Sequence, residues 1–175
     1  MNRYIRFTEQ LSVFLGIIAS ILLVIAVVVV CHMVFVRFVL DSSTSWQTEF
    51  VSYTLIASTF IGSPYVLLRR GHVFVELLPM MLDDRGRFYL ALFAYSISAL
   101  FCITLAYLSI EFWYEAWVEN WSSDTVWEPK LWKAYISMPI GFTAISMQYI
   151  ADILCLLSGR DMPFGLDQVN PSELE

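Results

Sequence analysis

Four stretches of the chain are long and apolar enough to cross a lipid bilayer, and this feature limits the possible folds more than any other. A spanning helix needs about 20 mostly apolar residues. The stretches that meet this length cover residues 11–36, 50–68, 89–110 and 136–157. The sequence therefore predicts an all-α integral membrane protein, in which residues 1–157 form one domain with four transmembrane helices.

The composition agrees with this prediction. Hydrophobic residues make up 58% of the 175-residue chain and charged residues 15%, whereas a soluble domain has roughly a quarter charged residues. The formal net charge of −6 gives no indication of nucleic-acid binding, because the acidic residues concentrate in one loop region and in the tail. The tail, residues 158–175, is polar, acidic and rich in turn-forming residues, so we expect it to be disordered in the cytoplasm.

Basic residues set the orientation of the spans, since they concentrate on the cytoplasmic side. With the N-terminus inside, seven of the ten Lys and Arg residues lie on the inner side. The inner ones are Arg3, Arg6, Arg69, Arg70, Arg85, Arg87 and Arg160, and the outer ones are Arg37, Lys130 and Lys133. We therefore expect both termini in the cytoplasm. The first apolar run exceeds the ~7–15 residues of a signal peptide's apolar core, so we expect it to remain as a span.

The inner loop between the second and third spans is unusually apolar. It begins LLRRGHVFVELLP at residue 67, and its arginines anchor the inner end of the second span. Phe74, Leu77, Leu78 and Met81 follow the spacing of one helix face. We expect a short amphipathic segment in the plane of the membrane, which lies in the interface or is covered by a partner protein.

Few residues in the spans are suited to chemistry. His32 lies near the outer end of the first span and His72 beyond the inner end of the second, so they cannot ligate one haem iron. We expect no catalytic, metal-binding or cofactor-binding residue in the chain. Gln148 and Asp152 share one face of the fourth span, and an acid inside a membrane is a candidate for ion or proton transfer. Alternatively, Asp152 reaches the inner surface or pairs with an arginine.

Small residues recur every four positions in two spans, at 54, 58 and 62 and at 94, 98, 102 and 106. This spacing lets helices approach closely in lipid, so it favours a packed bundle over a polar substrate pathway.

Two outer segments carry further candidates. In the first outer loop, Arg37, Asp41 and Glu49 are able to pair, and Trp46 suits the membrane interface. In the second, Trp113, Trp117 and Trp121 would form one stripe on a helix. The stripe fits either an aromatic belt at the membrane surface or a surface for a protein outside.

Several short elements resemble a known family. Trp46-Gln47-Thr48-Glu49 opens the second span, Gly62 follows, Arg70-Gly71-His72-Val73 begins the inner loop, and Met138-Pro139-Ile140-Gly141 opens the fourth span. From about Arg37 to Asp152, their order and spacing resemble the small membrane subunit of TRAP (tripartite ATP-independent periplasmic) transporters. The chain departs from the family pattern at Glu76, where Asp is usual, and at Glu128, where an apolar residue is frequent.

The resemblance implies a secondary, usually sodium-driven transporter of the bacterial inner membrane that takes up an organic acid such as a dicarboxylate or sialic acid. A large many-spanning subunit carries substrate and sodium, a periplasmic protein captures the substrate, and the small subunit is a non-catalytic scaffold that contacts lipids. The residues expected to serve partner contacts or structure are Arg37, Trp46, Glu49, Gly62, Arg70, Gly71, His72, Phe74, Glu76, Leu78, Pro139 and Gly141.

Two other functions remain open from the residues alone. One is a haem-bearing or structural membrane anchor of a redox complex, which would show visible absorbance. The other is a small transporter that acts alone through Gln148 and Asp152. The first would need an iron ligand besides histidine, and the second would need more intramembrane charges than the spans contain.

Overall fold

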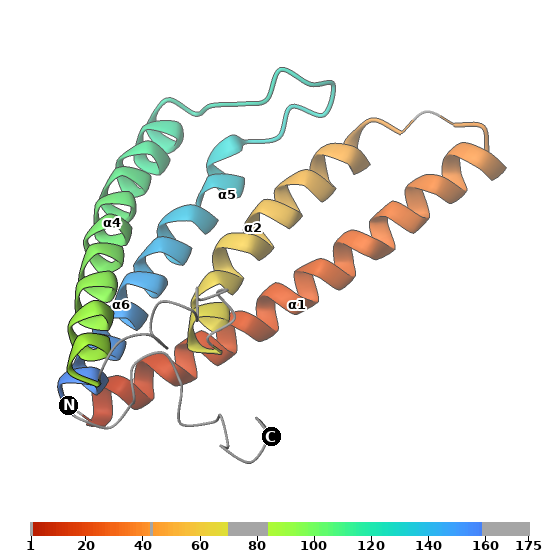
Figure 1. Cartoon of the computed structure of the whole chain (residues 1–175). Coiled ribbons are helices and arrows are strands. Elements are labelled where there is room, and N and C mark those ends of the chain that lie inside the picture. The colour runs from red at the N-terminus through yellow and green to blue at the C-terminus, as the bar shows by residue number, and fades with distance from the viewer. Residues whose placement is uncertain (1, 43, 70–83, 159–175) are drawn as a thin grey trace, which may run out of the picture.

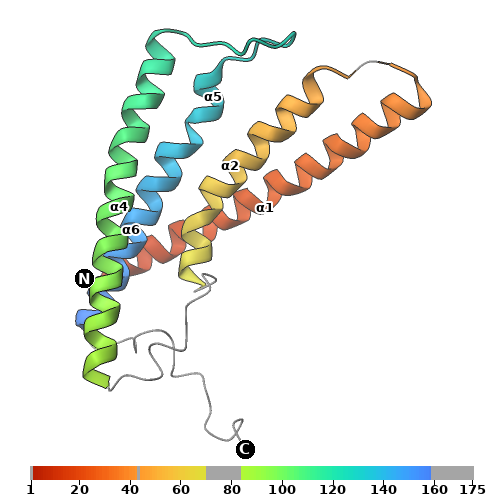
Figure 2. The same cartoon turned by 45° about the horizontal axis from the view of Figure 1, so that its top comes forward.

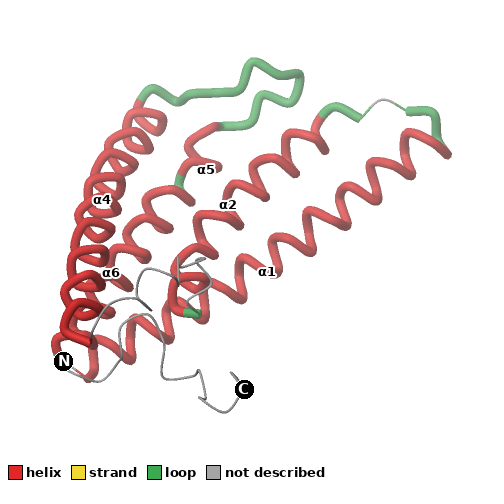
Figure 3. The backbone as a smooth tube through the Cα atoms, viewed as in Figure 1, coloured by secondary structure: helices red, strands yellow, loops and turns green. Residues whose placement is uncertain are grey.

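The computed structural model describes residues 2–42, 44–69 and 84–158. These residues form helices joined by loops (Figure 3). The helices are α1 (Asn2–Val39), α2 (Trp46–Leu68), α4 (Asp84–Val118), α5 (Leu131–Tyr135) and α6 (Ser137–Leu157).

The helices form two antiparallel pairs that meet along α6. α1 pairs with α2, and α4 pairs with α6, while α6 also contacts both α2 and α1. Near its N-terminus α1 crosses the bundle to reach α6, and its other half runs beside α2 (Figures 1 and 2). The outer turns that follow α1 and α4 lie at the same end of the bundle, which we call the outer end in keeping with the predicted orientation (Figure 1).

The prediction of an all-α membrane protein with four spans is confirmed. Four helical segments are long and apolar enough to cross a membrane: Arg3–Val39, Trp46–Leu68, Phe88–Val118 and Leu131–Leu157. Each of them extends beyond the predicted apolar run at one end or both, and the extensions are longest in the first and third. α1 starts at Asn2 rather than at residue 11, and α4 continues to Val118 rather than stopping at residue 110. The added residues include Arg6, Glu9, Glu111 and Glu115, which favour helix although they are not apolar.

Two prolines shape the helices differently. Pro139 lies in the first turn of α6, where the missing N–H costs little, and a break at Ile136 separates α6 from α5. Pro64 lies inside α2, which continues past it to Leu68. A proline inside a helix removes a hydrogen bond and bends the axis, and α2 bends toward its inner end (Figures 1 and 2).

The interior of the bundle consists mainly of small side chains. Its buried apolar residues include Ala19, Ala26, Ala91, Ala99, Ala116, Ala144 and Ala151. Large apolar side chains such as Phe14, Phe93 and Leu100 point outward. A soluble protein would bury such side chains, so this distribution fits a bundle whose outer surface lies in lipid.

The predicted in-plane segment lies outside the described residues, as does the tail from residue 159.

Candidate functional site

A chain of hydrogen bonds joins α1 to α6 in the inner half of the bundle. The Ser12 hydroxyl donates to Gln148 Oε1 at 2.9 Å, and Gln148 Nε2 donates to Asp152 Oδ1 at 3.0 Å. Gln148 is only 2% exposed and is among the largest fully buried side chains. Gln148 and Asp152, predicted to share one face of the span, are joined by this hydrogen bond, which was not predicted from the sequence.

The inner half of α1 presents further polar groups to α6. The Tyr4 hydroxyl donates to the Met147 carbonyl oxygen at 3.1 Å. Thr8 is completely buried and donates to the Tyr4 carbonyl of its own helix. Tyr4, Thr8 and Ser12 are spaced four apart, so they lie on one face of α1. This face holds α1 against α6 through polar contacts within the protein.

α6 approaches α2 closely at Gly141. A Cβ atom at this position would overlap the Phe60 carbonyl oxygen and would lie 2.7 Å from the carbonyl carbon. Pro64 leaves this carbonyl without its usual helical donor, and the Ser63 hydroxyl donates to it instead at 2.8 Å. The Phe60 carbonyl thus packs directly against Gly141, which has no side chain.

The contact between α2 and α1 uses the small residues that the sequence indicated. The Ser58 hydroxyl donates to the Ala19 carbonyl at 3.0 Å, and a Cβ on Gly62 would lie 3.1 Å from Ala19 Cβ. Gly16 of α1 faces Tyr65 so closely that a Cβ would lie 2.5 Å from the ring. The ladder at 54, 58 and 62 therefore packs helices together and does not line a pathway.

At the outer end, an aromatic cluster joins α2 to the loop between α4 and α5. Trp127 of this loop lies 6.2 Å from Trp46 and 6.5 Å from Phe50, measured between ring centroids. Trp46 also lies 6.4 Å from the His32 ring of α1. Trp46, predicted as an interfacial residue, thus bridges three parts of the chain while remaining 39% exposed.

Glu49 accepts hydrogen bonds from two sides. The Tyr53 hydroxyl of the same helix donates to Oε1 at 2.6 Å, and the Thr125 hydroxyl donates to Oε2. Arg37, Asp41 and Glu49 were considered able to pair, but the partners of this carboxylate are hydroxyl groups, and no ion pair between Arg37 and Glu49 is present among the described residues. Arg37 instead lies in the last turn of α1, beside Met33, Val34 and Phe38.

The loop that carries Thr125 and Trp127 is a small hairpin over residues 121–131. Ser123 N–H donates to the Pro129 carbonyl, and Leu131 N–H donates to the Trp121 carbonyl. Glu128 N–H closes the tip by donating to the Thr125 carbonyl, with φ of 43° at Glu128. The hairpin extends from the α4 side of the bundle toward α2 (Figure 1).

The expected stripe of three tryptophans is only partly present. Trp113 and Trp117 stack at 5.6 Å on the last turns of α4, and Trp113 Nε1 donates to the Trp132 carbonyl. α4 ends at Val118, so Trp121 lies beyond the helix and donates to Glu119 instead. The stripe was wrong at its third position because the helix does not continue that far.

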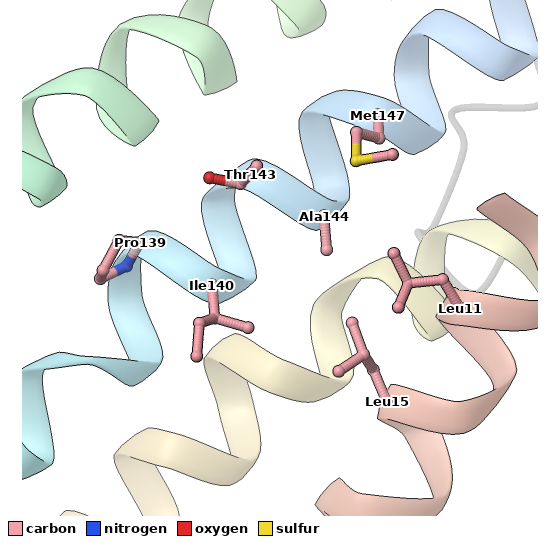
Figure 4. A pocket seen from close by; sticks show the side chains of 7 residues that line it. All are labelled: Leu11, Leu15, Pro139, Ile140, Thr143, Ala144 and Met147. Atoms are coloured by element: carbon pink, nitrogen blue, oxygen red, sulfur yellow. The ribbon is translucent and has the colours of Figure 1, made fainter.

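An apolar groove of about 390 Å³ lies between α1 and α6. Its lining residues are Leu11, Leu15, Pro139, Ile140, Thr143, Ala144 and Met147. Leu11 and Leu15 extend from α1 toward the side of α6 that carries Ile140 and Ala144 (Figure 4). The groove is lined by apolar groups, and the polar groups of Ser12 and Gln148 point into the helix contact beside it.

Six of the predicted contact residues, at positions 70, 71, 72, 74, 76 and 78, lie outside the described residues. The structure places the other candidates at three depths. Arg37, Trp46 and Glu49 lie at the outer end, Gly62, Pro139 and Gly141 lie in helix contacts, and Gln148 and Asp152 lie toward the inner end. They do not form a single site.

Sequence reasoning missed several important residues. The sequence did not indicate that Trp127 and Thr125 would contact α2. It also did not indicate that Gly16 would face Tyr65. Gln47 is 4% exposed, and its Oε1 has no hydrogen-bond partner among the described residues. Within the described ranges, no group of three or more His, Cys, Asp or Glu side chains is placed to hold a metal ion.

The sequence model of one protein family matches residues 26–159, which include α2, α4, α5 and α6. The family is described as "Tripartite ATP-independent periplasmic transporters, DctQ component". No curated protein and no solved structure gives a significant match.

Proposed function

The chain belongs to the family of DctQ components of tripartite ATP-independent periplasmic transporters, and we propose that, as the small membrane subunit of such a transporter, it acts as a scaffold for the large permease subunit. In this role the chain carries neither the substrate nor the coupling ion. The family match, which covers most of the chain, is the observation on which this proposal rests.

The side-chain distribution supports a scaffold. Most of the polar groups that the described bundle buries form hydrogen bonds within the protein, either to a carbonyl of their own helix, as Thr8 does, or to a neighbouring helix, as Ser12 does with Gln148. The described outer surface is rich in large apolar side chains on α1 and α4, which suit contact with lipid or with another membrane protein. The groove between α1 and α6 is also apolar and offers few groups that would bind a charged substrate.

We extend the proposal to the whole transporter from the resemblance noted in the sequence. Transport is coupled to sodium, and the substrate is an organic acid such as a dicarboxylate or a sialic acid. Substrate and sodium bind to the large subunit, to which a soluble periplasmic protein delivers the substrate. The location is the bacterial inner membrane.

Purification from native membranes tests the scaffold role. We expect the tagged chain, extracted in a mild detergent, to retain a large many-spanning subunit at equal stoichiometry, as measured by mass spectrometry. Reconstituted alone in liposomes, the chain is expected to give no uptake of organic acids above that of empty liposomes. Uptake by the chain alone would contradict the scaffold role and favour direct transport. Isolation of the chain without a large membrane partner would contradict the assembly.

The orientation of the chain gives a separate prediction. Val126 at the tip of the outer hairpin is 91% exposed, and Arg85 at the opposite end of the bundle is also exposed. In a background with Cys31, Cys102 and Cys155 replaced by alanine, we expect Val126→Cys to react with a membrane-impermeant maleimide in spheroplasts. Arg85→Cys is expected to react only after the membrane is opened. The reverse pattern would place both termini outside.

A further inference from the structure

The contacts that join the α1–α2 pair to the α4–α6 pair differ between the two ends of the bundle. Toward the inner end and the middle, the helices touch directly through Ser12 and Gln148 and through Phe60 and Gly141. Toward the outer end, the short α5 lies beside α2, and the hairpin reaches past it to Glu49, Trp46 and Phe50.

The two helix pairs diverge at the end where the hairpin makes its contacts (Figures 1 and 2). α1 and α2 lean away from α4 toward the outer end, whereas the two pairs converge at the inner end (Figures 1 and 2). The hairpin crosses the space between α4 and α2 at the wide end. It is closed by its own backbone hydrogen bonds, so it can move as one piece.

We propose that the hairpin of residues 121–131 is a latch that sets the angle between the α1–α2 pair and the α4–α6 pair. The pivot is the contact of Gly141 with the Phe60 backbone, where α6 packs against the backbone of α2 near the bend at Pro64. Release of the latch lets the α1–α2 pair swing at its outer end while the inner end stays in place.

The latch and the pivot differ in their exposure to water. Thr125 is exposed, Glu49 is partly buried and Trp127 is 42% exposed, so water can replace the contacts of the latch when it opens. Gly141, Ser12 and Gln148 are buried, and their contacts have no such replacement. Breaking the contacts of the hairpin therefore costs less free energy than breaking the buried contacts. Only the outer end of the α1–α2 pair moves when they break.

Pulsed electron spin resonance on the full-length chain in lipid nanodiscs tests this inference. Spin labels are attached to cysteines that replace Ser52 and Ile110, which are exposed at the outer ends of α2 and α4. A second labelled pair replaces Val66 and Tyr89 near the inner ends. The three native cysteines are replaced by alanine in both backgrounds.

In the double variant Glu49→Gln, Trp127→Ala we expect the outer distance to lengthen and its distribution to broaden, while the inner distance stays unchanged. Thr125→Val keeps the shape of the side chain and removes only its hydroxyl, so it is expected to produce a smaller change in the same direction. Val126→Ala is the matched control, because this tip residue is almost fully exposed, and it should leave both distances unchanged.

An outer distance that is unchanged in the double variant would overturn the latch. Equal broadening at both ends would overturn the pivot, since it would indicate general loosening of the bundle. The measurement reports on contacts within the chain, so its outcome is independent of the scaffold function. Failure of the chain to bind a large subunit would leave the expected distances as they are.

Discussion

Replacing Gly141 with alanine is expected to destabilise the bundle by about 3 kcal/mol, the upper part of the range for overpacked interiors. The added methyl group would overlap the Phe60 carbonyl oxygen. This obstacle is helix backbone, which cannot rotate away as a side chain can. α2 and α6 must therefore move apart, and the neighbouring contact of Phe60 with the Phe142 ring would be lost as well. The free energy of unfolding in mixed detergent micelles measures the effect.

Gly62→Ala is the matched control for this substitution. A Cβ at Gly62 would lie 3.1 Å from a single methyl group, Ala19 Cβ, and a shift of a few tenths of an ångström accommodates it. A glycine inside a helix costs roughly 0.5–1 kcal/mol relative to alanine, so this change is expected to be neutral or slightly stabilising. If both variants unfold with the same free energy, the close contact at Gly141 does not determine the packing of α6.

Replacing Gln148 with leucine is expected to cost about 2 kcal/mol, because it leaves two polar partners in a buried contact without the amide that joins them. The side chain keeps a similar volume, so the loss reports on hydrogen bonding more than on packing. Ser12 loses its acceptor, and the donor to Asp152 Oδ1 disappears. Unfolding free energies of the chain in detergent micelles provide the measurement.

Ser12→Ala provides the comparison, since it removes only one of the two bonds. Hydrogen bonds between membrane helices contribute about 0.6 kcal/mol on average, and we expect a loss of that size. The double variant should then cost less than the sum of the single changes, because both act on the same bond. Additive losses would show that Ser12 and Gln148 stabilise the bundle independently.

The number and approximate position of the spans were predictable from the sequence, because apolar length alone decides whether a helix can cross the membrane. The ends of the helices were less predictable. Glu111 and Glu115 ended the apolar run but not α4, since helix propensity extends a helix into water where apolarity stops. Trp121 was misplaced for the opposite reason, because the helix ends before it.

Most contacts of individual residues were not predictable from the sequence. The shared face of Gln148 and Asp152 followed from their spacing of four on one helix, but the hydrogen bond between them was not predicted. The acceptor role of Glu49 toward Thr125 depends on a partner 76 residues away, and only the folded bundle brings the two together. Gly141 was recognised as a family element, but its contact with the Phe60 backbone depends on the bend of α2 near Pro64.

The use of alanine and glycine where the helices meet has a consequence for the tolerance of the chain to substitution. In soluble proteins, truncating a large interior residue is usually the most damaging change, because it leaves a cavity. Here the interior side chains are already near the minimum size, so little can be removed from positions such as Ala91 and Ala151. Mutational damage is therefore asymmetric: enlargement is harmful where the added atoms would meet helix backbone, as at Gly141, whereas exchanges among large apolar residues on the outer surface leave the helix contacts intact.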